Sequence, residues 1–184
     1  MEALQAQYGD RANLELLVGG LRPGNTERFD PHRRDYILGH WHAVHERTAQ
    51  PFNFDFDMPQ DFTYDTEPAS RAVVVVRTLN PQKSLHYFKE IQRTFYVENQ
   101  DVTKERVLTK LALAQGIDKD TFQKNFHDKD IKQKVWDEFG RCRELGVSGF
   151  PSLLGMDGET PTSLTHGYLP IEALVPKVDA WLGM

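Results

Sequence analysis

Apolar residues recur at spacings of three and four through the middle of the chain, which is the pattern of amphipathic helices. The apolar stripe is clearest in the last of these segments, where it runs from Ile131 through Val135 and Phe139. Val73–Val76 alone would favour a strand, but Thr66 as an N-cap and a proline in the first turn favour a helix. The spacing therefore predicts a block of helices, at 35–47, 66–79, 81–97, from 101 or 103 to 116, 118–126 and 130–145.

The pattern differs at both ends of the chain. Residues 1–8 resemble the end of a helix, and 13–18 reads as a strand that stops at two glycines. After residue 146 we expect strands at 152–156 and 163–166 around an Asp-Gly turn, and then a helix from Pro170. The residues of that helix expected to face inward are Ile171, Leu174, Val178 and Trp181.

This order of elements predicts an α/β fold with a large all-helical insertion, because helices alone separate the first strand from the terminal strand–strand–helix unit. The domains expected from it are a core made of residues 1–29 and 147–184, and a helical insertion subdomain at 30–146. At 184 residues the chain is long enough to bury such a core without disulfide bonds.

Charge and hydropathy exclude several classes of function. The formal net charge is −5 and acidic and basic residues are interspersed, so we expect no nucleic-acid partner, since phosphate binding needs clustered Lys and Arg. The longest aliphatic run, Ala72–Val76, is far too short to cross a bilayer, so we expect no membrane partner. Residues 1–8 do not read as a secretion signal, which predicts a cytoplasmic protein.

The sequence holds one cysteine, Cys142, on the apolar stripe of its helix. We expect it to be a small core residue, because free cysteine is among the most buried residue types. A dithiol cycle needs an attacking and a resolving thiol, so one cysteine cannot complete it. His40, His42 and His45 are better explained as a helix surface than as a metal site, and we expect neither a metal nor a cofactor.

The most informative segment is 146–154, Gly-Val-Ser-Gly-Phe-Pro-Ser-Leu-Leu, which joins a helix end to a strand through a proline. It resembles the cis-proline loop of the DsbA-like family of thioredoxin-fold disulfide oxidoreductases, in the subgroup of protein-disulfide isomerases. Further segments carry the same resemblance: Gly19–Leu21, Tyr64–Ala72, Gln92–Tyr96 and His166–Tyr168. The resemblance implies that Gly149, Phe150 and Pro151 bind substrate through the Phe150 backbone, in the manner of an added strand.

In that family a first strand and a Cys-x-x-Cys motif precede the position of residue 1 in this sequence. The fold class is therefore a thioredoxin-like fold whose first strand is missing from the sequence as given. We expect the natural chain to begin further upstream, which sequencing of the upstream DNA would test. Without that strand the segment 13–18 would lie beside an open sheet edge, which a second copy could cover as a homodimer.

The resemblance implies a thiol–disulfide oxidoreductase or protein-disulfide isomerase that is inactive in redox without its cysteine pair. Its partner would be a thiol or disulfide of a peptide or protein. Two alternatives stay open: a glutathione-dependent enzyme of the kappa-class transferase and isomerase type, with glutathione as substrate, and a non-catalytic peptide-binding module. Arg93, Phe95 and Tyr96 could line a groove above the proline loop, or could pack between inserted helices.

Overall fold

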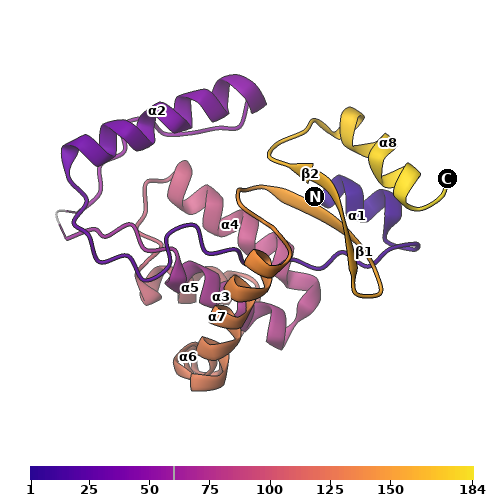
Figure 1. Ribbon diagram of the computed structural model, residues 1–184. Coiled ribbons are helices and arrows are strands. Elements are labelled where there is room, and N and C mark those ends of the chain that lie inside the picture. Colours follow the sequence, from indigo (N-terminus) through magenta and orange to yellow (C-terminus); the bar gives the residue numbers. More distant parts are fainter. Residues whose placement is uncertain (60) are drawn as a thin grey trace. The chain divides into compact units, whose positions relative to one another are not determined.

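The computed structural model describes residues 1–59 and 61–184 (Figure 1). The chain forms two compact units: residues 1–19 with 137–184, called here the hairpin unit, and residues 20–136, called the helical unit. Helix α7 (Lys129–Glu144) contributes residues to both units. The domain division expected at 29/30 and 146/147 stays a prediction. In the described part of the chain, no helix has the length and apolarity needed to cross a bilayer.

The hairpin unit consists of a two-stranded sheet with helices from both ends of the chain. Strands β1 (Ser152–Asp157) and β2 (Thr160–His166) pair antiparallel, from Ser152 opposite His166 to Asp157 opposite Thr160. Gly158 makes the turn between them with φ 58°, a conformation that favours glycine. Both expected strands are confirmed, and each extends further toward the turn than the pattern indicated.

Helices α1 (Glu2–Tyr8) and α8 (Ile171–Trp181) lie beside this hairpin (Figure 1). An isolated hairpin is marginally stable in water, so the apolar contacts with the two helices stabilise it. Trp181 lies directly against Gly155, because a Cβ built on that glycine would come within 2.4 Å of the indole ring. Ile171 is 36% exposed, so the expectation that it faces inward was wrong. One buried cluster of the unit is formed by Leu4, Tyr8, Leu164, Leu174 and Val178.

The strand expected at 13–18 does not form, and this segment is irregular. A strand needs a neighbouring strand for its hydrogen-bond ladder, and the only sheet in the described residues is the β1–β2 hairpin. The end of the segment instead contacts α7. The Val18 N–H donates to Glu138 Oε2 at 3.1 Å, and the Val18 carbonyl accepts from the Cys142 thiol at 3.6 Å.

The helical unit confirms the expected block of helices. Helix α2 begins earlier than expected because Asp30 caps it, accepting from the Arg33 N–H at 2.8 Å, and Pro31 occupies its first turn. The run Val73–Val76 is helical and no more than 1% exposed, so core packing outweighs its strand propensity. The elements are α2 (Pro31–Thr48), α3 (Glu67–Leu79), the 3-10 turn η1 (Pro81–Lys83), α4 (Ser84–Tyr96), α5 (Glu105–Ala114) and α6 (Lys119–His127), with the first half of α7.

Aromatic side chains form a large part of the helical unit's core. Phe56 is 1% exposed and its ring centroid lies 4.5 Å from Trp41, 5.4 Å from Phe29 and 5.6 Å from Phe95. Phe62 joins the same cluster at 5.1 Å from Phe29. Most of these pairs meet edge to face, the arrangement that aromatic quadrupoles favour.

Candidate functional site

The loop between α7 and β1 carries the residues that the sequence singled out. Gly146 ends the helix with φ 76°, and the Phe150–Pro151 peptide bond is cis. Two hydrogen bonds fix the loop: the Ser152 hydroxyl donates to the Gly149 carbonyl at 2.7 Å, and the Gly167 N–H donates to the Pro151 carbonyl at 2.7 Å. The second bond joins the loop to the end of β2.

Phe150 presents both a ring and a backbone to its surroundings. Its side chain is 47% exposed, although it is a large apolar residue. Among residues 1–59 and 61–184, neither the N–H nor the C=O of Phe150 has a hydrogen-bond partner. Tyr168, which follows the Gly167 that bonds to the loop, is 37% exposed. An exposed aromatic ring beside unpaired backbone groups is suited to an extended peptide, which needs backbone partners and a place for alternate side chains.

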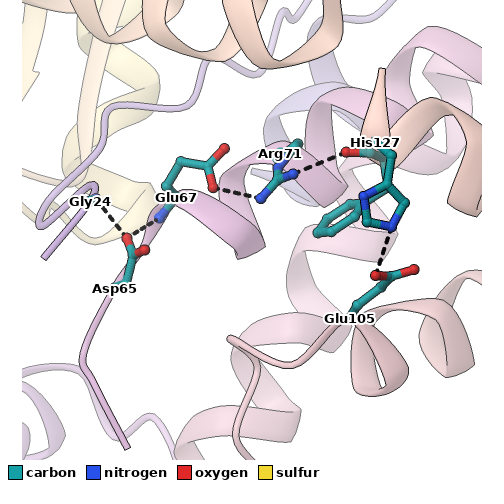
Figure 2. Close-up of polar contacts among 7 residues, drawn as sticks. Gly24, Asp65, Glu67, Arg71, Glu105 and His127 are labelled. Carbon is teal, nitrogen blue, oxygen red and sulfur yellow. Dashed lines mark hydrogen bonds and ion pairs between the residues drawn. The ribbon is translucent and has the colours of Figure 1, made fainter. Parts of the chain in front are cut away.

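The segment Tyr64–Ala72 forms a polar network at the start of α3 in the helical unit (Figure 2). Asp65 Oδ1 accepts from the Gly24 N–H at 2.8 Å and from the Glu67 N–H at 2.9 Å. Glu67 then pairs with Arg71 at 2.8 Å. Arg71 also donates to the Phe126 carbonyl at 3.1 Å and lies over that ring at 4.2 Å. These contacts join α3 to α6, so the segment Tyr64–Ala72 stabilises the helical unit.

A shallow hollow of about 290 Å³ adjoins this network, lined by Gly24, Asp65, Glu67, Arg71, Lys132 and Trp136. At the end of α6, His127 Nε2 lies 2.9 Å from Glu105 Oε2 (Figure 2). The hollow is open and of mixed charge, which matches no single ligand class.

Arg93, Phe95 and Tyr96 lie in the helical unit. Phe95 is 4% exposed and belongs to the aromatic cluster, with Tyr96 at 5.0 Å from it. Arg93 is an exposed side chain that pairs with Glu90 at 3.1 Å and with Glu98. The contacts of the two aromatic residues are those of packing between helices, and a contribution of these three residues to a substrate groove stays a prediction.

Cys142 is 6% exposed, as the apolar stripe predicted. Burial raises the pKa of its thiol, and the Glu138 carboxylate raises it further. Because the thiolate is the reactive form, a raised pKa and a bond from the thiol to the Val18 carbonyl make this cysteine a poor nucleophile. Cys142 is therefore a core residue of the hairpin unit.

We expect the Cys142 thiol of the native protein to react with 5,5′-dithiobis(2-nitrobenzoate) at pH 8 at least about a hundredfold more slowly than in 6 M guanidinium chloride. Denaturation removes the burial that raises the pKa, so the unfolded chain serves as the internal control. Equal rates in the two conditions would contradict a buried, protonated thiol.

Two histidines of α2, His42 and His45, contact an aromatic ring and a backbone carbonyl. The His42 ring stacks on Phe54 with 4.0 Å between centroids, and His45 Nδ1 lies 2.6 Å from the Gln50 carbonyl. In the described part of the chain, no group of three or more His, Cys, Asp or Glu side chains is arranged to hold a metal ion.

The fold and the loop together define a thioredoxin-like protein with an inserted helical subdomain. The family model of the DSBA-like thioredoxin domain matches residues 13–178. The chain belongs to this family.

A crystal structure from Nitrosomonas europaea, which carries a provisional assignment as a protein disulfide isomerase, is 39% identical to the chain with a TM-score of 0.92. It is matched over 99% of this chain and 87% of its own. The cytosolic disulfide reductase DsbM from Pseudomonas aeruginosa, also solved with GSH, shares the fold at 21% identity and a TM-score of 0.69, over 93% of this chain and 81% of its own.

Among curated proteins, the ClpXP adapter protein SpxH of Halalkalibacterium halodurans is 22% identical over 100% of this chain. The protein of the same name from Shouchella clausii is 21% identical over 62% of this chain and 44% of its own length. The chain spans 61% of the length of the first of these relatives.

Sequence reasoning missed one residue at the loop. The Phe150 ring lies directly on Gly19, which the sequence marked only as part of a glycine pair after an apolar run and of the family-like segment Gly19–Leu21. Nothing in the pattern links position 19 to position 150, because the contact is made only when the chain folds.

Proposed function

We propose that the chain is the substrate-binding part of a DsbA-like thiol–disulfide oxidoreductase, and that an extended peptide binds at Gly149, Phe150 and Pro151. The observation that carries the proposal is the backbone of Phe150, whose N–H and C=O have no partner among the described residues. A peptide running alongside would supply an acceptor and a donor to these groups, as in strand addition. The half-exposed Phe150 ring would contact the peptide's side chains.

These 184 residues should bind such a peptide without exchanging disulfides. In exchange, a thiolate attacks one sulfur of a disulfide and the other sulfur leaves as a thiolate. The one cysteine of the sequence is buried and its raised pKa keeps it protonated. No group in the chain as given supplies the attacking thiolate.

The test combines a binding and a turnover assay on the 184-residue chain. We expect saturable binding of fluorescein-labelled, S-carboxymethylated insulin B chain, measured by fluorescence anisotropy. We expect Phe150→Ala to weaken this binding by about tenfold, because it removes an aromatic contact. Leu113→Ala is the matched control, since Leu113 is 48% exposed but lies in the helical unit, and it should leave affinity unchanged.

In the turnover assay we expect insulin reduction by dithiothreitol to proceed at the uncatalysed rate. Clear turnover would refute the claim that the chain is redox-silent. Absence of binding, or equal effects of the two alanine variants, would refute the peptide site.

A second candidate is a non-catalytic protein-binding module that uses the same peptide site, which the single buried cysteine favours. Two relatives named as adapter proteins are consistent with a role outside redox chemistry. Glutathione is the remaining candidate ligand, since one protein of the same fold was solved with GSH. Calorimetric titration with glutathione separates this candidate from a peptide or protein partner, because a saturable heat of binding is expected only if glutathione is itself the ligand.

A further inference from the structure

Gly19 lies in direct contact with the ring of Phe150. A Cβ built on Gly19 would come within 1.9 Å of Phe150 Cε1 and 2.2 Å of Cζ. These distances are far below van der Waals contact, so the ring occupies the space that any side chain at position 19 would need. The Cε1–Cζ edge of the ring therefore packs against the backbone at Gly19.

The need for glycine at this position is spatial and not conformational. Gly19 does not adopt a positive φ, whereas its neighbour Gly20 does, at 66°. Alanine at position 19 is thus compatible with the backbone and conflicts only with the ring. This separates the contact with Phe150 from the ordinary role of glycine in a turn.

The Gly19 backbone is itself held in place by α7. The residue before it, Val18, is 7% exposed and makes both of its backbone hydrogen bonds to this helix. Its N–H donates to Glu138 Oε2 at 3.1 Å, and its carbonyl accepts from the Cys142 thiol at 3.6 Å. Glu138 and Cys142 lie four residues apart, on one face of α7. Helix α7 thereby fixes the surface on which Phe150 rests.

We propose that Gly19 is a positioning residue of the peptide site. It sets the orientation of the Phe150 ring, and the contacts of Val18 with Glu138 and Cys142 hold it in place. The effect of Gly19 on peptide affinity rests on the proposed peptide-binding function, but its contact with Phe150 can be tested without a ligand. This arrangement gives the buried thiol a role in the geometry of the site that needs no redox chemistry.

Gly19→Ala should move the ring while leaving the fold intact. Because Phe150 is 47% exposed, its ring can rotate toward solvent to make room for the new methyl group. We therefore expect a small shift of the urea midpoint and a larger loss of affinity, about five- to twentyfold, for the labelled insulin B chain. Gly140→Ala on α7 is the control, since outside the adjacent backbone of its own helix the nearest atom to the new Cβ is Arg143 Nη2, 3.9 Å away.

The decisive experiment is a double-mutant cycle with a spectroscopic readout. Nuclear Overhauser contacts between the Gly19 Hα protons and the Phe150 ring are expected in the wild-type chain and weakened in Glu138→Gln. In the Phe150→Ala background, Gly19→Ala should change neither the urea midpoint nor the remaining affinity. If Gly19→Ala alone fails to fold, Gly19→Ala/Phe150→Ala should restore folding.

Additive effects of the two substitutions, or absence of the nuclear Overhauser contacts, would overturn the positioning role. A wild-type chain that shows the contacts but binds no peptide would instead reject the proposed function and leave the Gly19 contact standing. The two failures are therefore distinguishable.

Discussion

Phe56→Ala is expected to lower the free energy of unfolding by about 4 kcal/mol, because it empties the centre of the aromatic cluster. Phe56 is 1% exposed and its ring contacts those of Phe29, Trp41, Phe62 and Phe95. Removing the ring takes away buried apolar area and leaves a cavity that these rigid neighbours cannot fill. Urea denaturation followed by circular dichroism measures the loss.

The same segment provides the control. Phe54 is only half-buried and stacks on His42 at the surface of α2. Phe54→Ala should therefore cost about 1 kcal/mol or less. Equal losses for the two variants would mean that the cluster around Phe56 is not the core of the helical unit.

Arg71→Met is expected to lower the free energy of unfolding by about 2–4 kcal/mol, because it leaves the largely buried Glu67 carboxylate without its cation. The side chains of Arg71 and Glu67 are only 13% and 12% exposed. Arg71 also satisfies the Phe126 carbonyl, which loses its donor in the variant. The double variant Arg71→Met/Glu67→Gln should recover part of the loss, since it removes the buried charge.

Arg93→Met is the matched control at an exposed ion pair. The Arg93 side chain is 50% exposed, and pairs of this kind contribute about 1 kcal/mol or less. The comparison is made by chemical denaturation at low and at physiological salt. A loss for Arg71→Met no larger than for Arg93→Met would contradict a structural role for the Glu67–Arg71 pair.

Much of the helical unit could be predicted from the sequence because its signals are local. The helix expected to start at residue 118 is α6, and Asp118 caps it by accepting from the Thr121 N–H at 2.9 Å. The spacing of apolar residues in α7 placed Cys142 inside the protein. The run Val73–Val76 was assigned correctly only because a cap and a proline outweighed its strand propensity.

The failures concern contacts between distant parts of the chain. Residues 13–18 have the composition of a strand, but a strand depends on a neighbour that local sequence cannot supply. The contact of Gly19 with Phe150 joins residues from opposite ends of the chain. Resemblance to a family located the loop at 149–151, but the contact of this loop with Gly19 could be found only from the structure.

The shielding of Cys142 has a practical consequence for spectroscopy. Because the sequence holds no other cysteine, a cysteine introduced in place of Tyr168, which is 37% exposed next to the loop, would be the one readily alkylated sulfur in the folded chain. A nitroxide or an environment-sensitive dye could then be attached beside the proposed peptide site, with no background labelling to remove. Titration with a guest peptide would report occupancy from the probe's own mobility or emission.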